Sequence, residues 1–546
     1  MRISLFFAAL SFALAPLAAH AQVAPDEPVF SPLAVKAHVD FLASNELEGR
    51  NAGTRGHEVA ARYVATRFES MGLKPGGPDG SWYQMVPLAD YALDPAKPAT
   101  LSVGGRNFAN GTDVLIAPSP RNGNTTQTVS APAVFAGYGL ESDYAGLDVK
   151  GKLVVVLFGV PKGLSTEAAR AAAQTEKGPI AGRHGAAGLI YVLTPQDEKR
   201  VSWNSARGYF LGAQSTWLGP NGFPQGVDPG VAIGAYANAG TARAMFEGAA
   251  MSADQVFEAA AAADGKVTGF PLKQPISLSR TSKVTIVNSP NVIGILPGSD
   301  PRLKSEYVVL SAHLDHEGID STLPGEDKIY NGAMDNAAGV ATMLEAARAF
   351  AESRKPPKRS ILFVALTAEE DGLIGSQYLA KYPVVGPGGK VIADVNLDMP
   401  ILLYDFKDVV AFGAEHSTLG PIVERAAARI GVTLSPDPMP EEQLFVRSDH
   451  YSFVKAGVPS VFLVTGFANG GEKAFRDFLA HNYHKVSDQT DLPFDWAAGA
   501  KFAQINYLIA REIADGPEAP RWYEGNSFGD RFAPGQPRAP RPAAKP

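Results

Sequence analysis

The stretch between residues 307 and 400 constrains the fold most, because apolar runs of strand length repeatedly end there in ionisable side chains. The runs that begin near residues 307, 361 and 391 are followed in turn by His313, by the pair Glu369 and Glu370, and by Asp398. In an open α/β sheet, ligands bind outside the carboxyl ends of the strands. The pattern therefore predicts that these side chains gather at one edge of a sheet.

Strand and helix patterns alternate regularly from Asn288 onwards. Apolar runs predict strands at 291–296, 306–312, 360–366, 391–397 and 459–465, and the pattern between them predicts helices at 337–351, 372–382, 418–431, 448–456 and 494–514. Strands separated by helices favour a mostly parallel central sheet with helices on both faces. The expected fold class is therefore α/β.

Residues 120–270 have a different texture, with short strands and Ala-rich helices of their own. The segment 146–152, which precedes an apolar run, and the segment 184–190 resemble the protease-associated domain, a small lid-like module inserted in several exopeptidases. The alternative is that residues 120–270 are an elaborated excursion of the main sheet. Together with the composition of the two ends, this divides the chain into a signal peptide at 1–21, a first part of the main domain at 30–119, a β-rich α/β protease-associated domain at 120–270, a second part of the main domain at 280–515 and a Pro-rich disordered tail at 516–546.

The first residues have the pattern of an export signal. Arg2 is followed by an apolar run from Ile3 to Ala19 and by the small-x-small sequence at 19–21, which predicts cleavage after Ala21. A membrane anchor is the alternative, but the run is short and is broken by Pro16. No second hydrophobic span follows, so the mature protein is expected in the periplasm or outside the cell.

Charge and cysteine content narrow the function further. The formal net charge of −7 gives no reason to expect nucleic acid or an anionic membrane surface as a partner. The chain contains no Cys, so it has no disulfides, and any metal site must use His and carboxylate ligands.

Two histidines and three carboxylates lie where ligands can converge. They are His313, Asp335, Glu370, Asp398 and His484. This mixture suits a pair of borderline divalent metals. Glu369 is then left free, and a free carboxylate beside a metal-bound water is what a hydrolase needs as general base.

Each position also has an ordinary structural explanation. A His after a strand is commonly a polar strand end, and an Asp before a helix is commonly an N-cap. The acidic cluster at 369–371 is equally typical of a first helical turn. His316 is close enough in sequence to compete with His313 as a ligand.

The motifs resemble those of the secreted di-zinc exopeptidases of clan MH, which include aminopeptidase Y, glutamate carboxypeptidase II and the transferrin receptor ectodomain. The matching pieces are His-x-Asp at 313–315, Asn-Gly-Ala-x-Asp-Asn-Ala-x-Gly at 331–339, Glu-Glu at 369–370, Asn-x-Asp-Met at 396–399, Arg-Ser-Asp-His at 447–450 and Tyr-His at 483–484. The loop at 46–54 and the segment 291–298 also look like bacterial members. The resemblance covers residues 33–514, and five ligands in family order favour a metal site over the ordinary explanations.

The resemblance implies a role for each residue in a site with two zinc ions. Asp335 would bridge the two ions, His313 and Asp398 would complete one site, and Glu370 and His484 would complete the other. A cis peptide bond is implied between Asp335 and Asn336.

Further roles follow from the same resemblance. Glu369 would be the general base, and the carboxylate of Asp315 would orient His313. Arg447, Asp449, His450 and Tyr483 would line the substrate pocket.

The function implied is that of an exported zinc-dependent aminopeptidase acting on peptides. It would hydrolyse the N-terminal peptide bond through a water that bridges the two zinc ions. A carboxypeptidase or dipeptidase of the same fold is the first rival, and it would need a cationic pocket, for which Arg447 is the only obvious candidate. The second rival is a catalytically silent binding protein, but no ligand or base is missing here.

Overall fold

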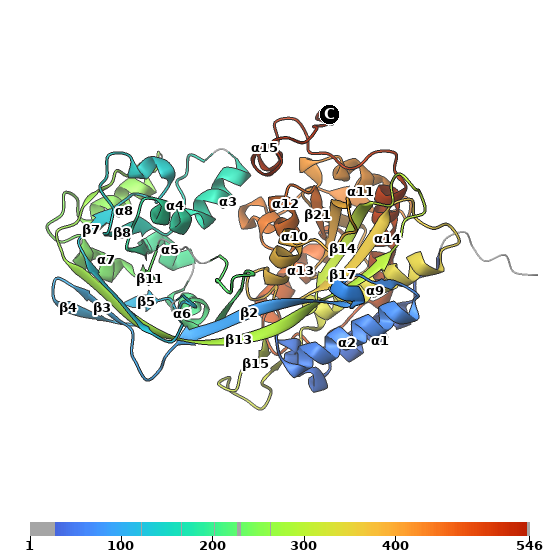
Figure 1. The fold of residues 1–546 in the computed structure, drawn as a ribbon, viewed down its shortest axis with the longest axis horizontal. Helices are drawn as coiled ribbons and strands as arrows, with labels where there is room; N and C mark the ends of the chain where they lie inside the picture. The colour runs from blue at the N-terminus through green and yellow to red at the C-terminus, as the bar shows by residue number, and fades with distance from the viewer. Residues whose placement is uncertain are drawn as a thin grey trace, which may run out of the picture.

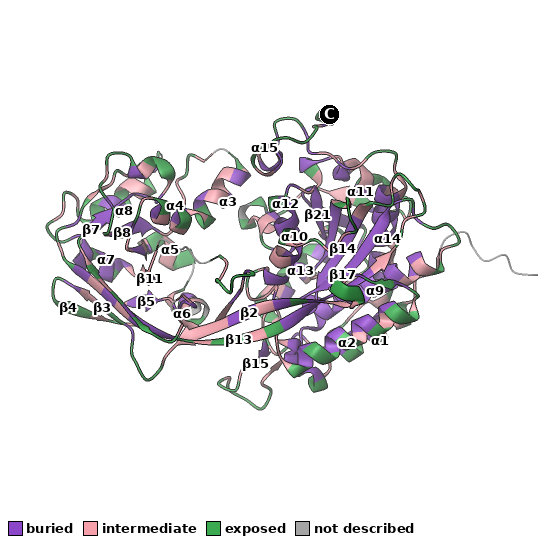
Figure 2. Ribbon diagram, viewed as in Figure 1, coloured by how far each residue is buried: buried purple, intermediate pink, exposed green. Residues whose placement is uncertain are grey.

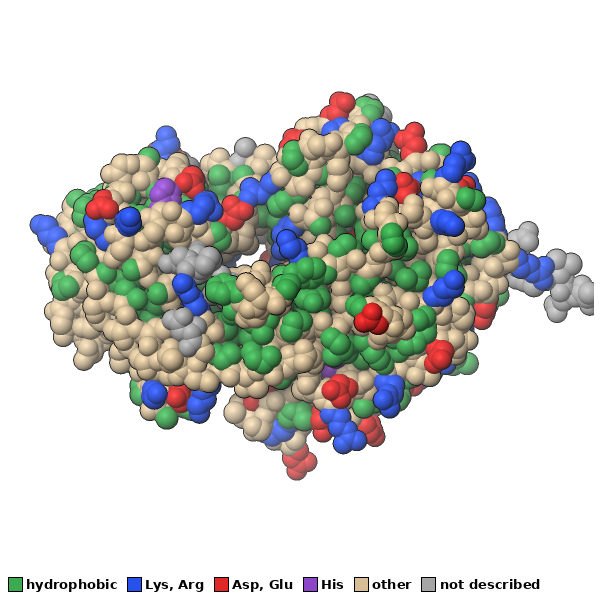
Figure 3. All heavy atoms as spheres, viewed as in Figure 1, with side chains coloured by type: hydrophobic (Ala, Val, Ile, Leu, Met, Phe, Trp, Pro, Cys, Tyr) green, Lys and Arg blue, Asp and Glu red, His purple; other side chains and the backbone are tan. Residues whose placement is uncertain are grey.

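Two lobes joined by a long antiparallel ribbon make up the structure (Figure 1). It is a computed structural model that describes residues 28–121, 123–164, 166–200, 202–226, 231–262 and 264–542. The predicted signal peptide at 1–21 lies outside the described residues. Within these ranges, no helix combines the length and apolarity needed to cross a bilayer. On the face shown in Figure 3, basic and acidic side chains are interspersed.

The larger lobe is built on a sheet whose central strands are parallel. Its strand order is β10-β2-β13-β17-β14-β18-β21-β19-β20. The strand bounds are β2 Tyr83–Leu93, β10 Gln214–Trp217, β13 Ile276–Leu296, β14 Glu306–His313, β17 Ser360–Leu366, β18 Lys390–Leu397, β19 Asp408–Phe412, β20 Thr433–Ser435 and β21 Ser460–Thr465. Strands β17, β14, β18 and β21 pair in parallel, whereas β13 and β19 pair with them antiparallel on either side.

Helices cover both faces of this sheet, because side chains of the central strands alternate between two apolar layers. The helices are α1 Pro32–Leu42, α2 Arg55–Ser70, α9 Ala338–Glu352, α10 Ile374–Lys381, α11 Leu419–Ala428, α12 His450–Lys455, α13 Gly471–His481 and α14 Trp496–Asp515. In β17, Phe363 packs with α2, α9 and α14, whereas Leu362 and Val364 pack with Leu379 of α10 and Phe453 of α12. A strand buried on both faces has an unbroken apolar sequence, and this explains the run at 361–365. The predicted α/β fold is confirmed.

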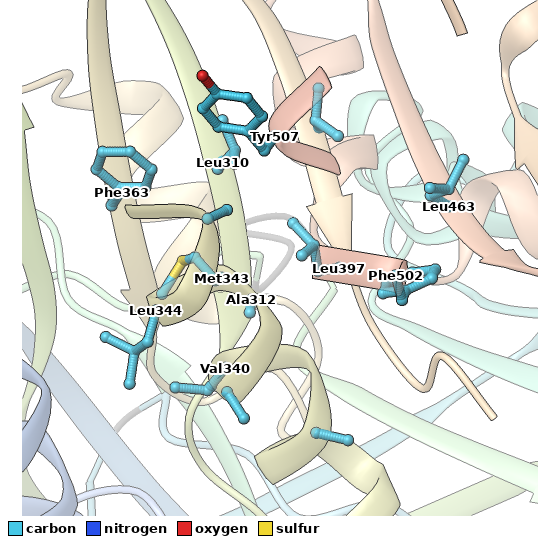
Figure 4. Close-up of a cluster of buried hydrophobic side chains, with 14 of the residues drawn as sticks. Leu310, Ala312, Val340, Met343, Leu344, Phe363, Leu397, Leu463, Phe502 and Tyr507 are labelled. Atoms are coloured by element: carbon cyan, nitrogen blue, oxygen red, sulfur yellow. The ribbon is translucent and has the colours of Figure 1, made fainter. Parts of the chain in front are cut away.

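The first of these layers is the largest apolar cluster of the larger lobe. Figure 4 shows how α9 and α14 fill it between the strands. The labelled side chains are Leu310, Ala312, Val340, Met343, Leu344, Phe363, Leu397, Leu463, Phe502 and Tyr507, all of them buried. The cluster includes Ala312, Met334 and Leu397, each of which is next to a ligand candidate in the sequence, so packing in this layer helps to position those candidates.

Strands β2 and β13 form the ribbon that connects the lobes. They pair from Tyr83 opposite Val292 to Leu93 opposite Ser282. The middle of β13, at 283–288, is exposed or half-buried, while both of its ends are largely buried (Figure 2). One strand therefore belongs to the core of both lobes.

The smaller lobe has its own sheet, in the order β12-β7-β8-β9-β11-β5. The bounds are β5 Val114–Ile116, β7 Ala133–Phe135, β8 Leu153–Leu157, β9 Gly188–Val192, β11 Ile233–Ala237 and β12 Phe270–Pro271. Strands β7, β8, β9 and β11 are parallel, and the two edge strands are antiparallel. Val155 faces one apolar cluster and Val154 the other, so this sheet too is covered on both faces.

The smaller lobe extends beyond the range 120–270. Its apolar core includes Leu101 and Val114 on one side of that range, and Ile276 and Leu278 on the other. These residues lie in short strands between Pro and Gly residues or in the shared strand β13. Their sequence pattern alone does not show which lobe they join.

The chain after Gly516 differs from the predicted disordered tail, because residues 517–542 pack on the larger lobe. Trp522 is buried and donates its indole N–H to the carbonyl of Gly457 at 3.0 Å. Asn526 caps the helix α15 (Ser527–Phe532), which buries Phe528. Isolated aromatic anchors between the prolines thus hold a segment whose composition suggested disorder.

Candidate metal centre

All five predicted ligands lie at one edge of the parallel strands or in the loops beside it. His313 ends β14, Glu370 follows β17 and Asp398 follows β18. Asp335 lies just before α9, and His484 follows α13. The edge is the one predicted from the strand ends in the sequence.

The donor atoms form two groups that share Asp335. His313 Nε2 lies 3.2 Å from Asp335 Oδ1 and 3.1 Å from Asp398 Oδ1. His484 Nε2 lies 3.4 Å from Asp335 Oδ2 and 3.1 Å from Glu370 Oε2. The two oxygens of one carboxylate therefore face two different histidines.

The chemistry of this donor set fits divalent cations. His313, Asp335 and Asp398 are buried together, and burial of several carboxylates is costly unless they are paired or bind a metal. Nε2 of His484 has no hydrogen bond of good geometry to any described residue, although it points at two carboxylates. Imidazole nitrogens and carboxylate oxygens are ligands that zinc accepts. Two groups with a shared carboxylate could hold two such ions.

A second acidic residue, Asp488, holds the loop that carries Asp335. The carboxylate of Asp488 accepts hydrogen bonds from the backbone amides of Met334 at 2.9 Å and Asp335 at 3.0 Å. The peptide bond between Asp335 and Asn336 is cis, as the resemblance implied. Sequence reasoning did not identify Asp488, although its place four residues after His484 was a usable signal.

Asp315 has a contact pattern other than the predicted one. Its carboxylate lies 3.9 Å from His313 Nδ1, which is too long for a hydrogen bond, and its backbone carbonyl lies closer to that nitrogen, at 3.2 Å. The carboxylate instead accepts the backbone amides of Glu369 and Glu370, at 3.1 and 3.2 Å. The side chain thus orients the turn after β17, and the main chain faces His313.

Glu369 lies beside the two groups and is turned toward a cavity. Burial, together with the nearby charges of Asp398 and Glu370, holds the pKa of Glu369 well above its usual value. Its backbone is held by Asp315, as described above. A carboxyl group in this setting binds a proton more readily than an exposed one.

The cavity has a volume of about 320 Å³ and is mostly apolar away from the ligands. Its charged wall consists of His313, Asp335, Glu369, Glu370 and Asp398. The opposite wall consists of Met399, Phe412, Met439, Leu444, Phe462, Val464, Phe475, Leu479 and Tyr483, with Glu442, Arg447, Arg476 and Ser448 also lining it. Every residue of this lining belongs to the larger lobe.

The part of the chain that carries the site is similar to a known family of proteins. Residues 291–510 match the model of peptidase family M28. The matched stretch, called the M28 segment below, contains all five ligand candidates together with Glu369 and Asp315, so this part of the chain is similar to a peptidase domain.

Individual relatives match over limited parts of their length. A probable zinc metalloprotease of Pyrenophora tritici-repentis is 35% identical over 146 residues, which are 26% of this chain and 31% of that protein. Aminopeptidase NAALADL1 of Rattus norvegicus is 28% identical over 137 residues, which are 24% of this chain and 16% of that protein. The chain thus spans less than a third of each of these relatives.

A solved structure shares the fold over nearly the whole chain. The aminopeptidase from Aneurinibacillus sp. strain AM-1 aligns over 90% of this chain and 95% of its own, with a TM-score of 0.52 and 19% identity. The smaller lobe before residue 279 lies outside the M28 segment. Its identity as a protease-associated domain stays a prediction.

The structure separates the four predicted pocket residues of the M28 segment into two pairs. Arg447 and Tyr483 line the cavity. Asp449 and His450 are fully buried and do not line it. His450 donates Nε2–H to the carbonyl of Phe445 at 2.6 Å and packs against the rings of Phe445 and Phe462. The prediction that Asp449 and His450 line the pocket is therefore not met, because successive residues at the start of α12 point in different directions.

Ser448 is the residue of this motif that touches a ligand candidate. Its hydroxyl donates to Asp398 Oδ2 at 2.6 Å, and it accepts the side-chain amide of Asn396 at 2.7 Å. The contact was missed because a Ser gives no ligand-type signal in sequence. The hydroxyl leaves Asp398 Oδ1 facing His313.

Proposed function

We propose that the protein is an exported zinc-dependent aminopeptidase that removes N-terminal residues from peptides. The main support for the proposal is that the two carboxylate oxygens of Asp335 face two different His–carboxylate groups at the wall of a cavity. The names of two similar proteins, aminopeptidase NAALADL1 and the Aneurinibacillus aminopeptidase, support the reaction class. The apolar run and small-x-small sequence at the N-terminus support export.

Two zinc ions are proposed, with Asp335 common to both. His313 and Asp398 would hold the first ion, and Glu370 and His484 would hold the second. When bound, the ions supply Lewis acidity toward a water and toward the scissile carbonyl group. The chain's own contribution is to fix the ligands and to handle the proton.

Glu369 is proposed as the general base. It lies on the same wall as the ligands, and its raised pKa suits a group that must bind a proton during the reaction. It would accept the proton of the attacking water and return it to the leaving amine. Asp315, which accepts the backbone amides of Glu369 and Glu370, would keep the base at a fixed distance from the ligands.

The arginines of the cavity support an aminopeptidase rather than a carboxypeptidase. Arg447 pairs with Glu442 at 3.7 Å, and Arg476 pairs with Glu472 at 2.9 Å. Neither is a buried, unpaired cation of the kind that binds a substrate carboxylate. The acidic ligand wall is better suited to a substrate's free amine, so the aminopeptidase is favoured.

The test is to measure metal content and substrate profile on the purified protein. We expect two zinc ions per chain and cleavage of amino-acid p-nitroanilides and of peptides with a free N-terminus. Acetylation of the N-terminus should abolish cleavage, whereas amidation of the C-terminus should leave it. The reverse pattern would identify a carboxypeptidase, and zinc binding without any hydrolysis would identify a binding protein.

A further inference from the structure

Two residues directly after Asp315 have contacts that the proposed reaction does not use. His316 is fully buried, and Glu317 is partly exposed at the mouth of the site. Both belong to the segment 314–319, which connects β14 to the short strand β15 (Gly318–Ile319). Their side chains point in different directions, and each of them meets a ligand candidate.

His316 meets Glu370. Its Nδ1 lies 2.6 Å from Glu370 Oε1, while Glu370 Oε2 faces His484. An ionised carboxylate can only accept, so Nδ1 of His316 carries the proton of this hydrogen bond. One oxygen of Glu370 is therefore held by His316, and the other is left for a metal.

Glu317 meets His484. Its Oε1 lies 3.2 Å from His484 Nδ1, while Nε2 of the same ring faces Asp335 and Glu370. A carboxylate at Nδ1 favours the tautomer with its proton there, which leaves the lone pair of Nε2 directed at the metal position. Partners of this kind raise ligand basicity and fix ring orientation.

The ligands proposed for the second ion are therefore both held from one segment. Glu370 is held by His316, and His484 is held by Glu317. The first group is held differently, with the backbone carbonyl of Asp315 at His313 and the hydroxyl of Ser448 at Asp398. The two proposed sites thus depend on different residues.

The segment 314–319 is itself fixed by the loop at 45–54. The buried guanidinium of Arg50 donates to the carbonyls of Leu314 at 2.9 Å, Asn331 at 2.6 Å and Gly332 at 3.1 Å. A Cβ on Gly49 would lie 2.4 Å from the carbonyl oxygen of Gly318, so the two backbones are in direct contact.

Gly332 makes room for the His316 ring. A Cβ there would lie 2.6 Å from the imidazole, and its φ of 58° is one that glycine adopts without cost. The loop at 45–54 and the space left by Gly332 therefore together determine the position of His316.

We infer that His316 and Glu317 are positioning residues for the second metal ion. They hold Glu370 and His484 in the orientation that binds it. The inference rests on the proposed function, in which Glu370 and His484 are zinc ligands. It assigns to these two side chains the control of affinity at one site of the pair.

The experiment measures stepwise zinc affinities by competition with a chromophoric chelator. The variants H316L and E317A remove the contacts, and H316N and E317Q retain a donor or an acceptor at the same place. Loss of such a partner weakens metal affinity by about 10–100-fold. We expect this loss at one of two sites in H316L and E317A, and a change within a few-fold in H316N and E317Q. Glu326→Ala, in the exposed part of the following loop, is the matched control and should change neither affinity.

Backgrounds with one impaired site show which ion responds. In Asp398→Ala the remaining tight zinc is assigned to the second site, so adding H316L should weaken it. In His484→Ala the remaining zinc is assigned to the first site, so adding H316L should leave it unchanged. Equal effects in both backgrounds would overturn the inference.

The possible failures are distinguishable. Wild type without stoichiometric zinc would remove the proposed function itself. Wild type with two zinc ions but unchanged affinities in E317A and H316L would remove only the positioning roles. Loss of one zinc in H316N as complete as in H316L would make His316 a ligand instead. If H316L does not fold, the comparison of E317A with E317Q tests the inference instead. The Glu317 side chain is 40% exposed, so its replacement is expected to leave the fold intact.

Discussion

At the scale of the residue, Glu369 and Glu370 show how neighbours in sequence take separate roles. Both backbone amides bind the carboxylate of Asp315, but Glu370 faces two histidines and Glu369 faces the cavity. The sequence could predict four of the ligand candidates because each lies at a strand end or a helix start, whereas His484, in a loop, was predicted from the Tyr-His motif of the resemblance. It could not predict that Asp449 and His450 are buried, since that depends on the direction in which α12 leaves its loop.

The separate role of Glu369 gives the first prediction. Glu369→Gln keeps the size and the backbone contact with Asp315 but cannot accept a proton. We expect both zinc ions to remain and turnover of a leucine anilide to fall by about 10²–10⁴-fold, the typical contribution of a positioned acid–base group. Metal analysis beside steady-state kinetics checks it. Loss of zinc in proportion to activity would contradict the assignment.

Buried neutral histidines give a second prediction at this scale. Burial lowers the pKa of His57 and of His450 to about 3. Below about pH 6.5 the unfolded chain binds protons that the folded protein excludes. The free energy of unfolding is therefore unaffected by these groups above pH 6.5 and falls as the pH drops toward 3, by about 1.4 kcal/mol per pH unit for each.

Urea unfolding between pH 6.5 and 5 tests whether stability falls with pH and whether His57 causes the fall. His57→Gln should show a shallower loss of stability with falling pH than wild type. The matched control is His481→Gln, which changes an exposed histidine and should keep the wild-type slope. Equal slopes in wild type and His57→Gln would show that His57 does not contribute.

At the scale of the element, local patterns predicted the central strands and their helices well, and long-range pairings poorly. The strands at 306–313 and 360–366 contain unbroken apolar runs, at 307–310 and 361–366, so their sequences alone identify them. The ribbon of β2 and β13 pairs residues about 200 positions apart, and the middle of β13, at 283–288, is exposed or half-buried. No local signal reports such a partner.

The third prediction concerns the C-terminal segment, where composition and structure disagree. Trp522 is buried in a cluster with Phe445, Tyr451 and Phe528. Trp522→Ala should therefore lower the free energy of unfolding by about 3–5 kcal/mol. Denaturant titration measures this, and Pro534→Ala in the same segment is the control. An unchanged unfolding curve for Trp522→Ala would favour the disordered tail expected from the prolines.

At the scale of the whole molecule, the smaller lobe touches the larger one beside the cavity without lining it. Ala168 of α3 (Glu167–Thr175) packs in the cluster that contains Phe412 and Phe462, and Glu176 pairs with Arg531 of α15. Phe412 and Phe462 also line the cavity. We therefore expect the lobe to shape access for longer peptides and to supply no catalytic group.

The fourth prediction tests this by removing the lobe at the ribbon. Leu93 and Ser282 are cross-strand partners, so a two-residue Asn-Gly turn placed directly after Leu93 can rejoin the chain at Ser282 as a hairpin. The folded variant should keep two zinc ions and turnover of a small anilide, while its preference among longer peptides changes. A folded, zinc-loaded variant that cannot cleave the anilide would show that the lobe supplies part of the active site.

The shared strand has a consequence for how chains of this kind diversify. Paired residues of an antiparallel ribbon lie about 5 Å apart, so the chain leaves the larger lobe and returns to it at nearly one point. A lineage can lengthen, exchange or lose the smaller lobe at this point in a single genetic event. The register of the sheet that carries the proposed metal ligands is inherited unchanged, so substrate range can evolve separately from the chemistry.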